Sequence, residues 1–258
     1  MTPSSRSFSA LWDGLGVTEG DHLFVHSSLA LALGNVDDAT ATELLESLAE
    51  RVGDLGTIVL PAFTYSLGRG ENFSRESSAG LNLMGALSGA AHRMNFYRTP
   101  DPMFSMLCSR PVDRTGPLDP ERSCSFGPES TFGKMFDRNY KVVCLGLDLG
   151  STLLHEIEVR LQVDYRFWKA FPWTNCGRVT PDSQEVWWTS VRSLDDPDTQ
   201  ADFRAFHEMF RNHDAVTTVK AGRRSSYSYF AQDCFAFLKE QLPILPKLLT
   251  RGGRHMLP

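Results

Sequence analysis

Short apolar runs alternate with amphipathic segments through the first 160 residues, and this alternation limits the chain to an α/β fold. Residues 22–26, 57–61 and 141–147 are apolar runs of strand length. Residues 39–52 place Leu44, Leu48 and Val52 on one side of a helix, after the capping residues Asp37 and Asp38. We therefore expect strands of a buried sheet connected by helices.

The strand predicted at residues 141–147 is followed by a polar turn and by a helix that begins near Ser151. This order places the start of a helix at the carboxyl edge of the sheet, where open α/β sheets bind ligands. The pattern also predicts a helix over 84–94, a polar loop over 66–80 and a strand at 186–188. Two further helices are predicted, over 199–212 and 227–238.

No repeat, low-complexity tract or clear linker divides the sequence, so residues 1–258 are predicted to form a single domain. The net charge of −5 and the scattered basic residues argue against nucleic acid as a partner. The five cysteines form no C-x-x-C pair and are expected to be reduced and mostly buried. The sequence shows neither a signal peptide nor a membrane span, and the cytoplasm is the expected compartment.

The segment that is most informative about catalysis is 151–158, because it places His155 and Glu158 one helical turn apart. An imidazole can accept the proton of an incoming ammonium group, and a neighbouring carboxylate can orient the ring or hold a cationic substrate. His155 could equally cap or pack at the start of its helix, and the spacing alone leaves both interpretations open. Glu156 lies four residues before Arg160 and is expected to form an exposed ion pair with it.

Two other catalytic motifs fail on spacing. In the zinc-protease motif H-E-x-x-H, the second histidine would fall at Val159, so no metal site is expected here. A phosphate-binding loop of nucleotide hydrolases needs a lysine after Gly150, and the chain has Ser151 there.

Several segments, in order and in register over most of residues 20–170, resemble the antibiotic N-acetyltransferase family of aminoglycoside N3-acetyltransferases. The matching segments are Phe24-Val25-His26-Ser27-Ser28-Leu29, residues 53–65 (GDLGTIVLPAFTY), residues 101–105 (DPMFS), residues 125–132 and residues 145–158. The resemblance implies a single α/β domain with a central mixed sheet flanked by helices. It further implies that residues 20–170 carry most of the CoA-binding and catalytic elements, and that residues 171–258 are an elaboration on the acceptor side.

The resemblance implies a CoA-dependent N-acetyltransferase, in which an amine attacks acetyl-CoA directly in a ternary complex. His155 would be the general base, Glu158 would hold the ring or the amine, and Thr152 and Ser27 could donate a hydrogen bond to the oxyanion. No metal is implied. The positions that match the family's pantetheine and phosphate channel are His26, Ser27, Ser28, Phe63, Thr64 and Ser105.

The acceptor is expected to be a small-molecule amine, either an aminoglycoside or an amino sugar. Tyr65, Glu71 and Asp101 are the candidate acceptor residues, and Asp101 stands where many drug-modifying members carry histidine. A homodimer is compatible with the sequence. Two alternatives remain open: a catalytically silent member that binds a CoA-like or cationic ligand, and a hydrolase that pairs His155 with Ser27 or Ser105.

Overall fold

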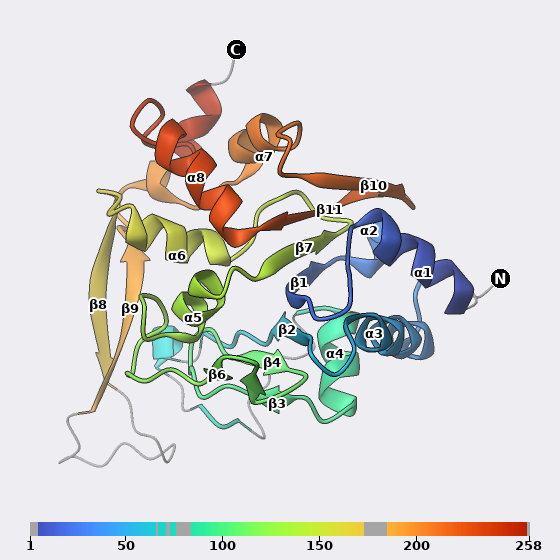
Figure 1. Cartoon of the computed structure of the whole chain (residues 1–258). Helices are drawn as coiled ribbons and strands as arrows, with labels where there is room; N and C mark the ends of the chain where they lie inside the picture. Colours follow the sequence, from blue (N-terminus) through green and yellow to red (C-terminus); the bar gives the residue numbers. More distant parts are fainter. Residues whose placement is uncertain (1–4, 66, 71–72, 76–83, 173–184, 257–258) are drawn as a thin grey trace.

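The computed structural model describes residues 5–65, 67–70, 73–75, 84–172 and 185–256, in which helices pack on both faces of one large sheet (Figure 1). The sheet has seven strands in the order β10-β11-β7-β1-β2-β4-β3. The strands of this sheet are β1 (His22–Ser27), β2 (Thr57–Pro61), β3 (Tyr97–Arg98), β4 (Met106–Cys108), β7 (Lys141–Leu145), β10 (Thr217–Ala221) and β11 (Arg224–Phe230).

The three central strands are parallel and the outer pairings are antiparallel, so the sheet is mixed, as predicted. Strand β1 pairs in parallel with β2 on one side and with β7 on the other. Strand β11 runs antiparallel to β7, and β4 runs antiparallel to β2. The sequence predicted these three central strands because each is an uninterrupted apolar run, which is typical of strands buried on both faces.

Two hydrophobic cores lie on opposite faces of this sheet, because alternate residues of each strand point to opposite sides. Leu23, Val25 and Val143 belong to one core and Phe24 and Val142 to the other. The first core is covered by α1 (Ser5–Gly14), α2 (Leu29–Ala32), α3 (Asp38–Val52) and α4 (Ala86–Arg93). The second is covered by α5 (Thr131–Asp137), α6 (Leu153–Arg160), α7 (Arg204–Phe210) and α8 (Ala231–Gln241).

Strands β1 and β7 are neighbours, yet the helices that follow them cover opposite faces of the sheet. Leu29 and Ala32 of α2 pack in the first core, whereas Leu153 and Ile157 of α6 pack in the second. A crevice therefore opens beyond the carboxyl ends of β1 and β7, at the topological switch point where α/β proteins bind ligands.

Gly146 ends β7 at this crevice in a conformation that favours glycine. Its φ is +64°, and a Cβ atom there would lie 2.4 Å from the backbone nitrogen of Ala32 and 2.8 Å from the carbonyl oxygen of Ser28. Only a residue without a side chain fits this close approach without strain. The chain after β7 therefore packs directly against the backbone of α2.

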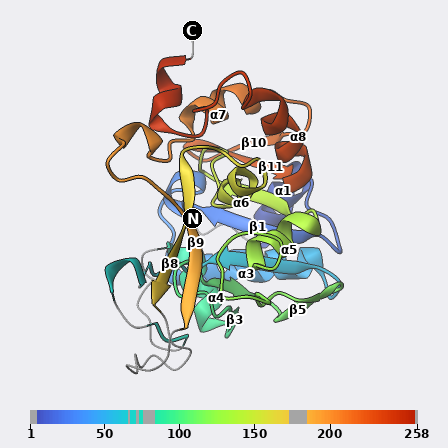
Figure 2. The ribbon, with the colours of Figure 1, turned by 90° about the vertical axis from the view of Figure 1, so that its left-hand side faces the viewer.

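A long hairpin of β8 (Arg166–Pro172) and β9 (Val186–Arg192) stands apart from the main sheet, at the left of Figure 1 and facing the viewer in Figure 2. Residues 123–125 extend it, because Ser125 N donates to the carbonyl of Trp188 and Trp188 N donates to that of Ser123. The described residues also form a small hairpin of β5 (Val112–Asp113) and β6 (Gly116–Pro117) and three short 3-10 helices. These helices are η1 (Leu67–Arg69), η3 (Pro197–Thr199) and η4 (Arg251–Met256).

Two predicted helices differ from the structure. The segment predicted as one helix over 199–212 is helical only over 204–210, because Ala201 pairs with Thr250 and the Asp202 carboxylate accepts from Arg204 N before the helix begins. The helix predicted over 227–238 begins at Ala231, since the preceding residues pair with β7. Of the predicted loop 66–80, residues 66, 71–72 and 76–80 lie outside the described residues.

The other predicted helices agree with the structure. Asp37 caps α3, with its carboxylate accepting a 2.8 Å bond from Thr40 N. The four cysteines among the described residues are free thiols, and three of them are buried. The predicted fold class, one α/β domain with a central mixed sheet, is confirmed.

Candidate active site

A cavity of about 480 Å³ opens at the switch point, and we refer to it as the switch-point cavity. It is lined by residues that follow the three parallel strands: the end of β1, the segment after β2 and the turn between β7 and α6. The lining residues that the sequence singled out are His26, Ser27, Ser28, Phe63, Tyr65 and Thr152.

His26 brings an uncharged imidazole to this cavity. Its ring packs edge-on against Phe24 with the ring centroids 4.6 Å apart, and burial lowers its pKa to about 4. Its Nε2 atom is buried and has no hydrogen-bond partner among the described residues. His26 therefore contributes a neutral ring to the wall of the cavity, with Nε2 turned away from solvent.

Thr152 stands at the N-cap of α6 and lines the same cavity, but its side chain does not cap the helix. His155 N donates to the carbonyl of Thr152 at 3.0 Å, so one helical turn separates this threonine from the imidazole. Thr152 therefore lines the cavity one turn before the imidazole along the helix.

His155 belongs to a compact group of polar side chains with Glu158, Tyr165 and Arg166. Nδ1 of His155 lies 2.6 Å from Oε2 of Glu158, and the Tyr165 hydroxyl donates to Oε1 of Glu158 at 2.8 Å. Nη2 of Arg166 lies 2.8 Å from Nδ1 and 3.3 Å from Nε2 of His155. Nε of Arg166 lies 2.5 Å from Oε2 of Glu158, in an ion pair without the alignment of a hydrogen bond.

The chemistry of these groups indicates the tautomer of His155. A carboxylate can only accept, so Nδ1–H donates to Glu158, and the lone pair of the ring is left on Nε2. The Arg166 donor near the ring can then bond only to Nε2. His155 is thus oriented by a buried carboxylate, as expected of a histidine that accepts a proton at Nε2.

Burial and then the charge of Arg166 lower the pKa of His155, against the raising effect of Glu158. Burial acts to raise the pKa of Glu158, but His155 and Arg166 together outweigh it, and the net pKa is lowered. Both shifts favour the same pair of charge states: a neutral imidazole beside an ionised carboxylate. That pair is ready to take up one proton.

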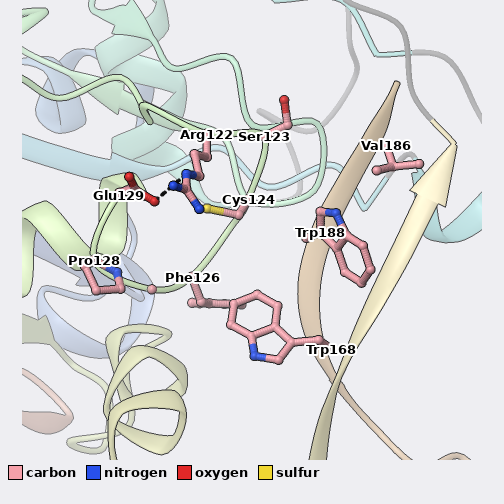
Figure 3. Close-up of a pocket in the computed structure, with 10 residues that line it drawn as sticks. Arg122, Ser123, Cys124, Phe126, Pro128, Glu129, Trp168, Val186 and Trp188 are labelled. Carbon is pink, nitrogen blue, oxygen red and sulfur yellow. Dashed lines mark ion pairs between the residues drawn. The ribbon is translucent and has the colours of Figure 1, made fainter. Parts of the chain in front are cut away.

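A second cavity, of about 580 Å³, lies against the β8–β9 hairpin (Figure 3), and we refer to it as the aromatic cavity. Phe126, Trp168 and Trp188 provide aromatic walls, and Val186 and the other lining residues of segment 122–129 provide the rest. Arg122 and Glu129 form an ion pair at 2.7 Å within its lining.

His155 lines neither cavity, but a neighbour of it lines each one. Three residues before it, Thr152 lines the switch-point cavity. Phe126 of the aromatic cavity meets the imidazole edge-on, with the ring centroids 5.9 Å apart. The His155 side chain keeps 14% of its surface exposed, so the ring is not sealed into the interior.

Three other candidate residues point into the protein interior. Thr64 donates to the carbonyl of Pro102 at 2.8 Å, and Ser105 donates to that of Ala62 at 2.7 Å. Asp101 accepts from the backbone nitrogens of two residues that follow it, at 2.8 and 2.9 Å, and burial raises its pKa to about 6. These contacts hold the segment after β2 against the segment before β4. Glu71 lies outside the described residues.

The predicted ion pair between Glu156 and Arg160 forms, but the prediction that Glu156 is exposed is wrong. Glu156 does bind Arg160, at 2.7 Å, but its side chain is fully buried and also accepts a 2.6 Å bond from Gly127 N. The reason is tertiary: segment 122–129 covers this face of α6. Glu156 thereby fixes the wall of the aromatic cavity to the helix that carries His155.

Sequence reasoning missed Tyr165 and Arg166, which hold Glu158, and the tryptophans of the aromatic cavity. The one signal was the alternation of side chains in segment 166–172, which predicts a strand with Arg166 and Trp168 on the same face. Nothing in the sequence indicates that this face meets α6.

The fold is similar to that of solved acetyltransferases. The chain is 20% identical to the structure described as AAC-VIa bound to sisomicin, with a TM-score of 0.74, and the match covers 95% of this chain and 98% of that one. For AAC-IIIb in a binary complex with CoASH the identity is 18%, the TM-score 0.71 and the coverage 94% and 97%. For a histidine-to-alanine mutant of AAC(3)-IVa in complex with a gentamicin, the identity is 19% and the TM-score 0.72. That match covers 98% of this chain and 97% of the mutant's. No curated protein matches the chain by sequence.

These likenesses define the class of the molecule by its fold, which is that of the aminoglycoside acetyltransferases. The family model described as aminoglycoside 3-N-acetyltransferase matches residues 24–243. The chain therefore belongs to the aminoglycoside 3-N-acetyltransferase family, and it is an acyltransferase that uses acetyl-CoA as its co-substrate.

Within the part of the chain that the structure describes, His, Cys, Asp and Glu side chains form no group that could hold a metal ion. None of the described helices combines the length and the apolar character needed to span a bilayer.

Proposed function

We propose that this enzyme transfers the acetyl group of acetyl-CoA to a primary amine of a small molecule, by direct attack in a ternary complex with His155 as general base. The observation that carries this proposal is the His155–Glu158 pair, 2.6 Å apart, whose imidazole follows Thr152 of one cavity by one helical turn and contacts Phe126 of the other. In this arrangement the thioester occupies one side of the imidazole and the amine the other.

The switch-point cavity takes the pantetheine arm of CoA. Of the residues that the family resemblance assigns to this channel, His26, Ser27, Ser28 and Phe63 line the cavity. Backbone and hydroxyl donors at strand ends suit the amides of pantetheine. That AAC-IIIb was solved with CoASH supports a CoA site in this fold.

The reaction uses one proton acceptor. The amine nitrogen forms a bond to the thioester carbonyl carbon while Nε2 of His155 takes the proton that the nitrogen loses. The oxyanion of the tetrahedral intermediate accepts from the Thr152 hydroxyl or from Ser27. When the C–S bond breaks, the proton on His155 passes to the departing sulfur, which leaves as CoA thiol, and the amide product remains.

Glu158 and Arg166 act on the substrates through His155. Glu158 fixes the ring so that its lone pair is on Nε2, 3.3 Å from Nη2 of Arg166, and it stabilises the imidazolium that forms. Arg166 keeps Glu158 ionised and, together with burial, keeps the resting imidazole neutral.

The test is steady-state acetyl transfer, followed by the release of CoA thiol with an amine panel. We expect His155→Ala to lower kcat by about 10²-fold or more with a modest change in CoA affinity, as for the loss of a general base. Protection of the variant against thermal unfolding by CoA would show that the cofactor site is intact. Unchanged turnover in His155→Ala would remove the imidazole from the mechanism.

The two alternatives predict different behaviour in the same assay. A silent binder would be protected by CoA and would release no thiol with any amine. A hydrolase would cleave esters without CoA, and it would need His155 to contact Ser27 or Ser105. In the structure the imidazole contacts Glu158 and Arg166, and Ser105 is engaged with the Ala62 carbonyl.

A further inference from the structure

The turn between β7 and α6, residues 146–152, is held by side chains from the second half of the chain, and we refer to it as the β7–α6 turn. Leu149 N donates to Nδ1 of His207 at 3.2 Å, and the Leu149 carbonyl accepts from the Tyr229 hydroxyl at 3.0 Å. Both bonds are buried. The two backbone groups of Leu149 are thus paired with side chains of α7 and β11, as buried backbone groups require.

Two glycines bring the rest of the turn against the same elements. Gly146 N donates at 3.0 Å to Oγ of Ser226, which belongs to β11. A Cβ atom on Gly150 would lie 2.5 Å from the ring of Phe203, the residue directly before α7. The turn is therefore packed too closely against α7 and β11 to shift independently of them.

The β7–α6 turn also forms part of the wall of the switch-point cavity. Leu147 lines this cavity two residues before Leu149, and Thr152 lines it three residues after. The imidazole of His155 has a separate contact, to Arg166 of β8. A displacement of Leu149 would therefore act more directly on the cavity wall than on the imidazole.

The bond to Leu149 defines the tautomer of His207. Because Nδ1 accepts from a backbone N–H, the proton of the neutral ring is on Nε2, which lies 3.8 Å from Oδ1 of Asp148. Burial has the largest effect on the pKa of His207, and the net pKa is lowered. The ring is therefore neutral near pH 7, as an accepting Nδ1 requires.

We infer, on the basis of the acetyl transfer proposed above, that His207 is a positioning residue for acetyl-CoA. Its bond to Leu149 N sets the β7–α6 turn, and with it the wall of the cavity that takes the pantetheine arm. Helix α7 thereby serves the cofactor side of the enzyme, although the family resemblance assigns residues 171–258 to the acceptor side.

The first experiment compares His207→Leu with His207→Asn. The two new side chains branch alike, but Oδ1 of asparagine can accept from Leu149 N in place of Nδ1 and leucine cannot. We expect His207→Leu to raise KM for acetyl-CoA about tenfold and to change KM for the amine less than about threefold. His207→Asn should keep both KM values within about threefold of the wild type. Equal KM values for acetyl-CoA in the two variants would overturn the role of this bond.

His213→Leu is the matched control. Nδ1 of His213 also accepts from a backbone nitrogen, that of Ala215, at 3.2 Å, but this bond is exposed. Both residues lie outside the described lining of the switch-point cavity, so the control should leave both KM values unchanged. A rise in KM for acetyl-CoA as large as in His207→Leu would show that the effect does not depend on the β7–α6 turn, and would overturn the inference.

Amide hydrogen exchange of Leu149, measured without ligand, tests the bond itself. Exchange should be faster in His207→Leu than in the wild type or in His207→Asn, and unchanged protection in a folded His207→Leu protein would refute the bond's importance. Tyr229→Phe covers the case in which His207→Leu does not fold, because it keeps the ring and removes only the donor to the Leu149 carbonyl. It should also raise KM for acetyl-CoA, and an unchanged KM would count against the positioning role of the turn.

Calorimetric titration of CoA separates this role from the proposed function. Tighter CoA binding by the wild type than by His207→Leu, without turnover of any amine, would support the positioning role and contradict acetyl transfer. Acetyl transfer by the wild type, with the same KM for acetyl-CoA in both His207 variants, would contradict the positioning role alone.

Discussion

Replacing Arg166 by methionine should move the acid limb of the pH–rate profile to higher pH. Nη2 of Arg166 lies 2.8 Å from Nδ1 of His155, and its charge lowers the pKa of that imidazole, second only to burial. The base must be neutral to accept a proton, so a lower pKa keeps it active at lower pH. Without the guanidinium, the attraction of Glu158 remains and the pKa of His155 rises.

The size of this shift in the pKa of His155 follows from the distance between the two side chains. Two unit charges about 4 Å apart interact by about 4 kcal/mol at an effective dielectric constant of about 20. Water and a relaxed Glu158 would fill the space that the side chain leaves, and they would offset more than half of this energy. We expect a net shift of about one pH unit, which corresponds to about 1.4 kcal/mol.

The assay is kcat/KM for one amine and acetyl-CoA between about pH 5 and pH 9, since this ratio reports the free enzyme's essential base. The ionisation of the amine is common to both enzymes, so it cancels in the comparison. Arg192→Met is the matched control, because Arg192 pairs with Arg166 across the hairpin and donates to the Ser193 carbonyl. An acid limb that stays in place, or moves to lower pH, would refute this account of Arg166.

Three further predictions concern buried groups. Glu158→Gln should leave the Arg166 cation without its carboxylate and lower the free energy of unfolding by about 3 kcal/mol in urea titrations. Gly146→Ala should destabilise by about 2 kcal/mol or more, because its φ is +64° and its Cβ would meet backbone; a mutant with an unchanged unfolding midpoint would argue against that close contact. Glu156→Ala should remove the acceptor of a buried N–H group and raise KM for the amine more than for acetyl-CoA, whereas equal effects on both would separate it from the aromatic cavity.

Much of the central sheet was predictable because its strands are uninterrupted apolar runs. Strand β2 occupies the predicted residues 57–61, and the helix after Asp37 begins where the cap residue indicates. The errors fall where pairing partners are distant in the chain. Tyr227 belongs to a strand because β7, some 80 residues earlier, offers it a hydrogen-bonding edge.

Helix α1 shows a different limit of prediction from sequence, because no helix was predicted there. The polar residues at the start of the chain concealed an apolar side made of Phe8, Leu11, Trp12 and Leu15, all of which are buried. The spacing i, i+3, i+4, i+7 was present in the sequence, and a search for that period would have found it.

The sequence by itself determined the class of fold, the positions of the central strands and the pairing of His155 with Glu158, because strand burial and helical spacing are local properties of the chain. Tertiary structure alone decided that Arg166 of the hairpin lies beside that pair and that Glu156 is buried. Those contacts depend on where the hairpin and segment 122–129 pack against α6, and no local pattern encodes a packing partner.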